Sequence, residues 1–400
     1  MSDDFPSGSD PLQFLMKNML GGQFGSAFGQ GTDFRWEMVS SMASLSLAGP
    51  DGTLYEPNVD PSLRIKIDRL FELAEMRFET LDMLPDLAKA NRTVQVVNHQ
   101  GLIKIYLERQ KETFQSLLDA LTPDADPGSG PSDENDPAAQ MERMMMMMQR
   151  IAAPAMVASQ LGWVLGEFAK TCVGPLELTI PRAATGGVEL VGSNLAAFAD
   201  RHGLDFDQLA LWTLIRELVH LSILSTPQVR ERLETLIALH IADRGSATNS
   251  TMQALSEIDP TDPEAMKALL ANPASLISIP VNDAQLRTQS EIEAILSFTE
   301  GMVQYQTRLA AAYLIGDFTA IETATSSHRF NPGNPMQSIS AMLGITVTEA
   351  MLEMGAAFIS GVLERDGGPA LAKVWTDSQR LPTPAEIGAP GLWLARMEFL

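Results

Sequence analysis

One segment constrains the fold of this chain more than any other: LDFDQLALWTLIRELVHLSIL, residues 204–224. Its apolar residues fall on nearly every side of a helix, and a helix that is apolar all round lies in the protein interior. Thr213, Arg216, Glu217 and His220 are spaced by three or four residues, so they form one polar stripe. Because unpaired charges inside a protein are costly, other segments must supply partners for this stripe. The sequence therefore predicts a buried central helix over residues 205–224.

The composition excludes several classes of partner. The chain has 400 residues, of which 45% are hydrophobic, and this is enough to bury a substantial core. Its formal net charge of −22 argues against nucleic acid and anionic membranes, which bind proteins through Lys and Arg. Cys172 is the single cysteine, so an internal disulfide and a thiolate-rich zinc cluster are both excluded. A reducing, cytoplasmic location is therefore expected.

Export and membrane insertion are not expected either. The first residues, MSDDFPSGSD, contain neither the basic start nor the apolar run of a signal peptide. The longest apolar window, residues 151–169, contains Pro154, Gln160 and Glu167. A membrane span needs about 20 apolar residues, so this window favours a buried helix.

Composition and periodicity divide the chain into four parts. Residues 1–33 are rich in Gly, Phe, Ser and Asp and predict a disordered tail, and the acidic, proline-rich residues 122–138 predict a disordered linker. Residues 34–121 predict an N-terminal helical region, and residues 139–400 a domain that contains the central helix. Further helices are expected at roughly 34–48, 60–83, 101–121, 194–200, 226–243, 263–271, 283–315, 336–365 and 368–377.

Strand signals are few, so the predicted fold class is mainly α with a small β-hairpin. RTVQVV, residues 92–97, could form a short strand. LELTIP and GVELVG flank a glycine-containing turn and predict a hairpin over about residues 176–192. Gly301 lies inside a predicted helix, where glycine costs about 1 kcal/mol relative to alanine. This indicates close approach of another helix, with the 205–224 helix as the candidate.

The polar stripe contains a metal-site pattern in which one ligand has changed. Arg216 to His220 read R-E-L-V-H, and histidine in place of the arginine would give H-E-x-x-H, the signature of zinc peptidases. In that signature two imidazoles one turn apart hold the zinc, and the glutamate takes a proton from the metal-bound water. A guanidinium stays charged and has no free lone pair, so Arg216 cannot bind zinc. Glu217 and His220 are what is left of the pattern.

The same residues also fit a purely structural role. A single histidine in a core helix usually makes only a hydrogen bond, and Glu217 could form an ion pair with Arg216 or with another basic residue. Spacing alone favours this structural interpretation. His240 and His328 stay open as further metal ligands.

Several segments, taken in order, resemble a known family. They are VQVVNHQGLIKIYLE, GPLELTIP, VELVGSNLAAFA, LWTLIRELVHLSIL, SFTEGMVQYQTRL and the C-terminal block that begins ERDGGPALAKVW. Together they are similar to the zincin-like hydrolases and zinc-dependent metalloproteases of actinobacteria, one branch of which is associated by name with deazaflavin cofactor biosynthesis. The resemblance extends from about Asp33 to the end of the chain and implies a zincin-like helical domain.

The resemblance implies a role for each residue that matches the family pattern. The general-base glutamate falls on Glu217, the second histidine ligand on His220, and a carboxylate ligand on Glu300. Two positions depart from the pattern, because Arg216 replaces the first histidine and Tyr305 stands where the Glu-Gly segment usually ends in histidine. Glu300 is expected close to Arg216 and His220.

Two functions are compatible with this pattern. The resemblance implies a zinc-dependent metallopeptidase or hydrolase, with Glu217 as the base and with His220 and Glu300 as zinc ligands. The changed position favours an inactive relative that keeps the fold to bind a peptide or protein. In that relative Arg216 substitutes for the metal charge and pairs with both carboxylates, Glu217 and Glu300, through charge-assisted bonds.

Overall fold

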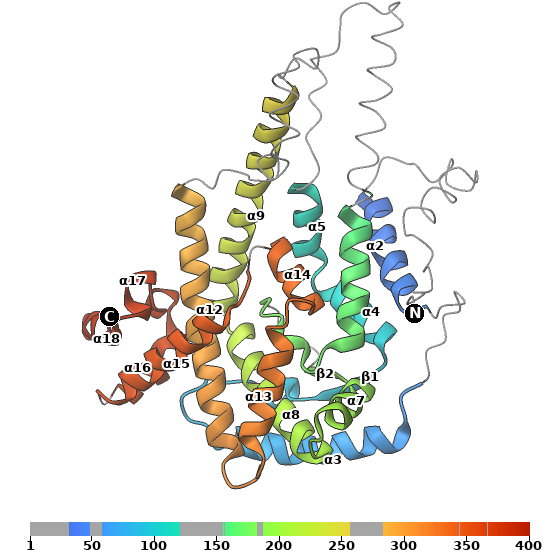
Figure 1. Cartoon of the computed structure of the whole chain (residues 1–400). Coiled ribbons are helices and arrows are strands. Elements are labelled where there is room, and N and C mark those ends of the chain that lie inside the picture. The colour runs from blue at the N-terminus through green and yellow to red at the C-terminus, as the bar shows by residue number, and fades with distance from the viewer. Residues whose placement is uncertain are drawn as a thin grey trace, which may run out of the picture.

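Helices form most of the described chain. The computed structural model describes residues 32–48, 58–120, 155, 157–181, 187–256, 283–343, 345–365 and 367–400. Its α-helices are α2 (Thr32–Ser46), α3 (Pro61–Phe78), α4 (His99–Arg109), α5 (Lys111–Ala120), α7 (Gly192–His202), α8 (Phe206–Ser225), α9 (Pro227–Ser256), α12 (Asp283–Ala311), α13 (Phe318–Arg329), α14 (Pro335–Leu343), α15 (Glu349–Leu363), α16 (Gly368–Lys373), α17 (Pro384–Ile387) and α18 (Pro390–Met397). Residues 157–171 are also helical. The prediction of a mainly α fold is confirmed (Figure 1).

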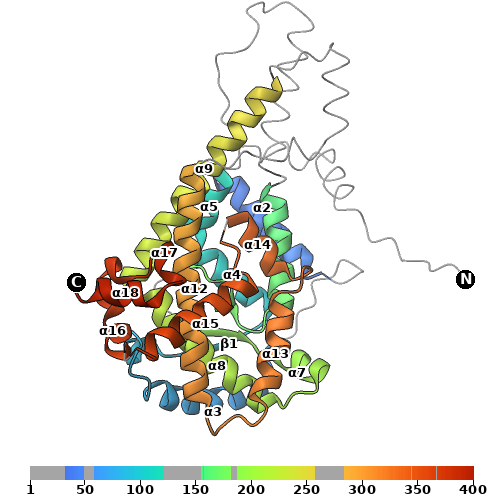
Figure 2. The same cartoon turned by 60° about the vertical axis from the view of Figure 1, so that its left-hand side comes forward.

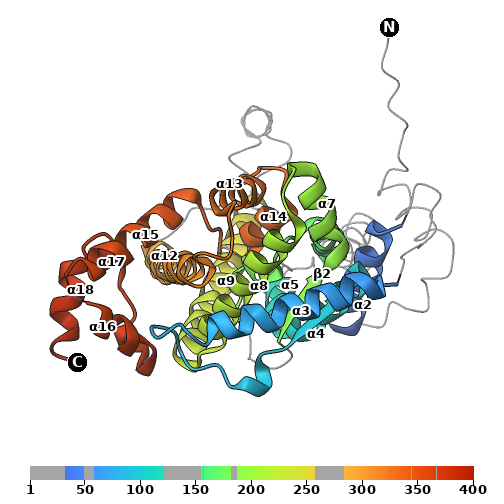
Figure 3. The ribbon, with the colours of Figure 1, turned by 90° about the horizontal axis from the view of Figure 1, so that it is seen from below.

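Helix α8 is the buried central helix that the sequence predicts. Its N-terminus is capped by Asp205, whose side chain accepts a hydrogen bond from the Gln208 N–H at 2.9 Å. Every residue from Leu209 to Ser225 is buried, because α3, α7, α9 and α12 pack around the helix. Seen from below, α3 runs across α8 (Figure 3). The polar stripe of α8 therefore faces other parts of the protein.

The two strands pair differently from the prediction. β1 (Val94–Val97) and β2 (Val188–Val191) form a parallel pair in which these residues lie opposite one another in order. The strand predicted at 92–97 is confirmed, but the hairpin over 176–192 is wrong. Its first arm forms a 3₁₀ turn, η2 (Pro175–Glu177), followed by irregular chain that bonds to glutamates of α8 and α12. Helices between β1 and β2 supply the crossover that a parallel pair requires.

Several other expectations change in the structure. The single helix predicted at 336–365 is in fact two helices, α14 and α15. Helix α15 has its own N-cap, Thr348, whose hydroxyl accepts a hydrogen bond from the Met351 N–H at 3.3 Å. Helix α13 was not predicted. The predicted tail apart from residues 32 and 33, the linker at 122–138 and the helix at 263–271 lie outside the described residues.

Gly301 permits close helix packing, but its partner is α15 and not α8. A Cβ atom on Gly301 would lie 2.4 Å from the carbonyl carbon of Gly355, and one on Gly355 would lie 1.9 Å from the carbonyl oxygen of Ser297. The two glycines let the backbones of α12 and α15 touch, and Figure 2 shows α15 lying across α12. The sequence indicates the need for a close neighbour, but it does not indicate which helix carries the second glycine.

One hydrophobic core joins the two ends of the described chain. Its buried residues run from Val39 in α2 to Trp393 in α18. Among the described helices, none is by itself long and apolar enough to cross a membrane, and α8 with the first part of α9 meets the criterion only as a pair bent by 75°.

Candidate functional site

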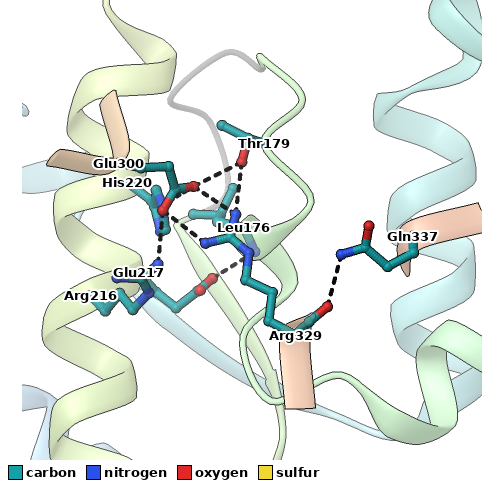
Figure 4. Close-up of polar contacts among 8 residues, drawn as sticks. All are labelled: Leu176, Thr179, Arg216, Glu217, His220, Glu300, Arg329 and Gln337. Atoms are coloured by element: carbon teal, nitrogen blue, oxygen red, sulfur yellow. Dashed lines mark hydrogen bonds and ion pairs between the residues drawn. The ribbon is translucent and has the colours of Figure 1, made fainter. Parts of the chain in front are cut away.

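The polar stripe of α8 meets α12 at Glu300. Arg216 donates a hydrogen bond from Nη2 to Glu300 Oε2 at 2.9 Å, and His220 Nε2 lies 3.4 Å from Glu300 Oε1. All three side chains are buried. The expected proximity of Glu300 to Arg216 and His220 is confirmed, as Figure 4 shows.

A second arginine, to which the sequence did not point, completes this site. Arg329 is the last residue of α13 and donates from Nη1 to Glu300 Oε2 at 2.8 Å and from Nη2 to Glu300 Oε1 at 2.7 Å. Such a forked pair combines strength with a fixed geometry. The Thr179 hydroxyl adds a third donor to Oε1 at 3.1 Å. Both oxygens of Glu300 are therefore filled by protein donors. Arg216, Glu300 and Arg329 together form the arginine cluster.

Arg329 is held in place by amides that follow it in the chain. The side chain of Gln337 donates to the carbonyl oxygen of Arg329 at 2.8 Å, and that of Asn334 donates to the carbonyl oxygen of His328 at 2.9 Å. These bonds satisfy the last carbonyl groups of α13. In the sequence this region, SSHRFNPGNP, has the composition of an ordinary polar turn, so nothing there marks the arginine as buried.

Glu217 leaves α8 in a different direction from Arg216. Its Oε2 accepts the backbone N–H of Leu176 at 2.9 Å. A Cβ atom on Gly174 would lie 2.3 Å from its Oε1, so a larger residue at 174 would require this carboxylate to move. The expectation that Arg216 pairs with both glutamates is wrong for Glu217, because the ion pair of Arg216 within the described chain is with Glu300. Successive helix residues point about 100° apart, which separates the two side chains.

The surroundings keep His220 neutral and Glu300 ionised. Burial lowers the pKa of His220 to about 4, and the arginines add to this against the opposing effect of Glu300. Burial alone would raise the pKa of Glu300. The charge and hydrogen bonds of Arg329, together with the hydrogen bond from His220, instead hold that pKa well below its ordinary value. An ionised carboxylate can only accept, so the proton of His220 is on Nε2, facing Glu300.

A cavity of about 700 Å³ lies on one side of the arginine cluster. All three cluster residues line it, together with Trp212 of α8 and Phe330, and hydroxyl and amide side chains of α12 and α13 form much of the remaining wall. Glu217 and His220 are not part of this wall. The volume falls within the range of about 300–1,000 Å³ that is usual for small-ligand sites.

The donor groups at the cluster do not fit a zinc ion. A zinc ion is bound by the lone pairs of several ligand atoms that face one point. Here both oxygens of Glu300 accept hydrogen bonds from guanidinium groups, and Nε2 of His220 carries a proton, so their lone pairs are not free for a metal. In the described part of the chain, no group of three or more His, Cys, Asp or Glu side chains is arranged to hold a metal ion. His328, considered as a further ligand, has its Nε2 3.0 Å from the carbonyl oxygen of Thr171.

Comparison with known proteins assigns the chain to a family. A family described as zincin-like metallopeptidase matches residues 35–394. The chain belongs to the zincin-like metallopeptidase family. This zincin-like protein also shares its fold with a solved "putative hydrolase with a novel fold" from Chloroflexus aurantiacus, with a TM-score of 0.58 and 17% sequence identity over 92% of this chain and 98% of that chain. No curated protein matches the sequence.

Proposed function

We propose that this zincin-like protein is a non-catalytic member of its family that uses the fold to bind a peptide or protein. The observation that carries the proposal is the pairing of one buried carboxylate, Glu300, with two buried arginines. A carboxylate that binds zinc gives its lone pairs to the metal. Here Arg216 and Arg329 take those lone pairs and supply the positive charge that the ion would bring.

The arginine cluster also links separate segments of the chain, as a bound metal can do. It connects α8, α12, α13 and the segment after η2, which are distant from one another in the sequence. Removing one partner from a buried ion pair typically costs about 3–5 kcal/mol, because the other charge is left uncompensated. These ion pairs therefore supply a connection between separate segments that a bound metal could otherwise provide.

The position of Glu217 supports a non-catalytic role. A general base must come within about 2.6–3.2 Å of the proton that it removes, directly or through one water. Glu217 instead bonds to the backbone of Leu176 and does not line the cavity. The hydrolase function that the family description implies would need this carboxylate to turn towards a substrate.

The cavity supports a binding role. It lies against the arginine cluster and has the volume of a ligand site. Side chains with hydroxyl and amide groups can both donate to and accept from a peptide backbone. The strong negative charge of the chain makes a nucleic acid an unfavourable partner.

Metal content tests the proposal directly. The full-length protein, purified without chelators, should contain far less than one zinc per chain by elemental mass spectrometry. Its melting temperature should not change with added zinc or with a chelator, because an ion that binds only the folded state would raise it. One zinc per chain, together with a lower melting temperature after chelation, would show that the proposal is wrong.

A pair of variants tests the role of the arginines. Arg216→His alone leaves Arg329 forked on Glu300, whereas Arg216→His combined with Arg329→Gln frees the carboxylate and restores the missing imidazole. Zinc should raise the melting temperature of the double variant but not that of Arg329→Gln, which is its matched control. If zinc raises the melting temperature of the unmodified protein by as much, Arg216 does not block the site.

A further inference from the structure

We infer that the cavity beside the arginine cluster is a carboxylate-binding site in which Arg216 contacts the carboxylate of the ligand. The inference deepens the proposed function and rests on it, because a zinc ion at the cluster would engage the same groups. Four observations carry it: an unused donor on Arg216, the charge of the wall, the neighbouring Trp212, and the size and lining of the cavity.

Arg216 has donors that no protein group uses. Its one hydrogen bond among the described residues runs from Nη2 to Glu300, which leaves Nη1 without an acceptor, and its buried Nε has none either. Both terminal nitrogens of Arg329, by contrast, bond to Glu300. Arg216 is 8% exposed and Arg329 only 2%, although both line the cavity. Arg216 is thus the guanidinium that can reach a ligand.

The wall beside Arg216 carries one unbalanced positive charge. Arg216 and Arg329 bring two cations and Glu300 one anion, while His220 and Glu217 lie outside the wall. Of the other two glutamates that line the cavity, Glu322 is paired with Arg308 at 2.6 Å. Glu349 lines the cavity as an exposed residue in the first turn of α15. A single excess charge on a buried wall favours a ligand with one negative charge.

Trp212 supplies a further unused donor beside Arg216. The two residues lie one turn apart on α8, and the guanidinium carbon of Arg216 is 5.4 Å from the centre of the indole ring. The indole N–H is buried and has no acceptor among the described residues. Indole and guanidinium nitrogens can only donate, so this wall requires a ligand that accepts.

A carboxylate satisfies these conditions better than other anions. It carries one negative charge, and its planar pair of oxygens matches the donors of a guanidinium. A phosphate monoester would bring a charge of about −1.5 to −2 next to Glu300, which repels it. The cavity of about 700 Å³ has room for a ligand of the size of a short peptide. The carboxylate could belong to a peptide C-terminus or to a small organic acid, and the experiment distinguishes the two.

The experiment compares matched ligands on the full-length protein. One probe is an equimolar library of N-acetylated tripeptides with free carboxyl ends, the second is the same library with C-terminal amides, and the third is acetate, benzoate and citrate. Saturation-transfer NMR detects binding, with EDTA present so that the readout does not depend on zinc. We expect the acids to bind and the amides to bind at least about tenfold more weakly, since a charge-assisted hydrogen bond is lost.

Two variants locate the contact. Arg216→Lys keeps a positive charge beside Glu300 but removes the forked donors, and it should weaken acid binding about tenfold or more. Arg64→Lys is the matched control, because Arg64 is exposed on α3 and does not line the cavity. It should change nothing. Melting temperatures verify that each variant is folded. If Arg216→Lys does not fold, Trp212→Phe, which removes only the indole donor, takes its place.

Each outcome decides the inference. Binding of the acid library alone supports a peptide C-terminus, and binding of small acids alone supports a small-molecule ligand, with the same carboxylate chemistry. Binding of amides and acids alike, or of neither, overturns the inference. Full binding by both Arg216→Lys and Trp212→Phe also overturns it. These failures differ from failure of the proposed function, which the zinc content of the purified protein reveals.

Discussion

Glu300 is an anion enclosed by two cations and a neutral imidazole. Its oxygens accept from Arg329 at 2.7 and 2.8 Å and from Arg216 at 2.9 Å. A buried carboxylate is costly unless counter-charges and hydrogen bonds replace the water that it loses, and residues of α8 and α13 supply them here. His220 shares this environment, and its neutral state depends on burial in the folded protein.

The dependence of the free energy of unfolding on pH should therefore reveal the protonation of His220. Its pKa is about 4 in the folded protein, against an ordinary value of 6.5. Below pH 6.5 this histidine binds a proton in the unfolded chain but not in the folded one, so the free energy of unfolding falls as the pH approaches 4. The full effect is roughly 3 kcal/mol. The depressed pKa of Glu300 adds a further loss as the pH falls through about 4.5, its ordinary value, because the unfolded carboxyl group then becomes protonated.

Urea unfolding at pH 7 and pH 4.5 measures this effect. His220→Gln keeps a neutral donor beside Glu300 but cannot titrate, so it should lose less stability between the two pH values than the unmodified protein. The comparison is needed because the pKa of His328 is lowered as well. Equal losses in the two proteins would show that His220 is not held neutral by burial.

At the scale of elements, contact between α12 and α15 positions Glu300. The two helices meet at Gly301 and Gly355, and Gly301 directly follows Glu300 in the chain. Phe298 and Phe358, from the same two helices, stack edge to face with ring centres 5.9 Å apart. The place of the carboxylate opposite α8 thus depends on how closely α15 approaches the other side of α12.

Gly355→Ala should test this helix contact. Its new Cβ atom would lie 1.9 Å from a backbone oxygen that cannot move away easily, so the free energy of unfolding should fall by about 1–3 kcal/mol. This loss outweighs the higher helix propensity of alanine. Gly388→Ala is the control, because that residue has φ −89° and no atom within 4 Å of a Cβ there. Chemical denaturation of both variants is the measurement, and similar losses would contradict the helix contact.

At the scale of the whole molecule, the arginine cluster joins segments that lie far apart in sequence. Thr179, Arg216, Glu300 and Arg329 come from four separate parts of the chain. The same parts share a hydrophobic core that runs from α2 to α18. The N-terminal helices therefore contribute to the packing that encloses the cluster.

The described chain should unfold in one cooperative transition. Because α3 packs on α8 and the core is shared, loss of the N-terminal helices would expose the apolar face of the central helix. Circular dichroism and tryptophan fluorescence should give the same midpoint in urea, since Trp212 in α8 and Trp393 in α18 belong to the same core. Separate midpoints would indicate that the N-terminal helical region folds as its own unit.

Local patterns in the sequence were sufficient to define the central helix and its polar stripe. An all-round apolar pattern requires burial whatever the surroundings, and a polar stripe at a spacing of three and four requires partners, so α8 and the need of Arg216 and His220 for partners could be predicted. The resemblance to the family, and not a local pattern, pointed to Glu300 as one of these partners. The strand at 92–97 had a local signal of the same kind. Such patterns depend on residues that are near one another in the chain.

Which distant groups fill the site is visible only in the folded protein. Arg329 follows an ordinary polar stretch, and its burial depends on where α13 ends against α12. The segment at 176–181 has strand-forming residues, yet in the folded protein Leu176 donates to Glu217 and Thr179 donates to Glu300. A contact between distant segments leaves no periodic signal in the chain, so only the folded arrangement shows that two arginines pair with Glu300.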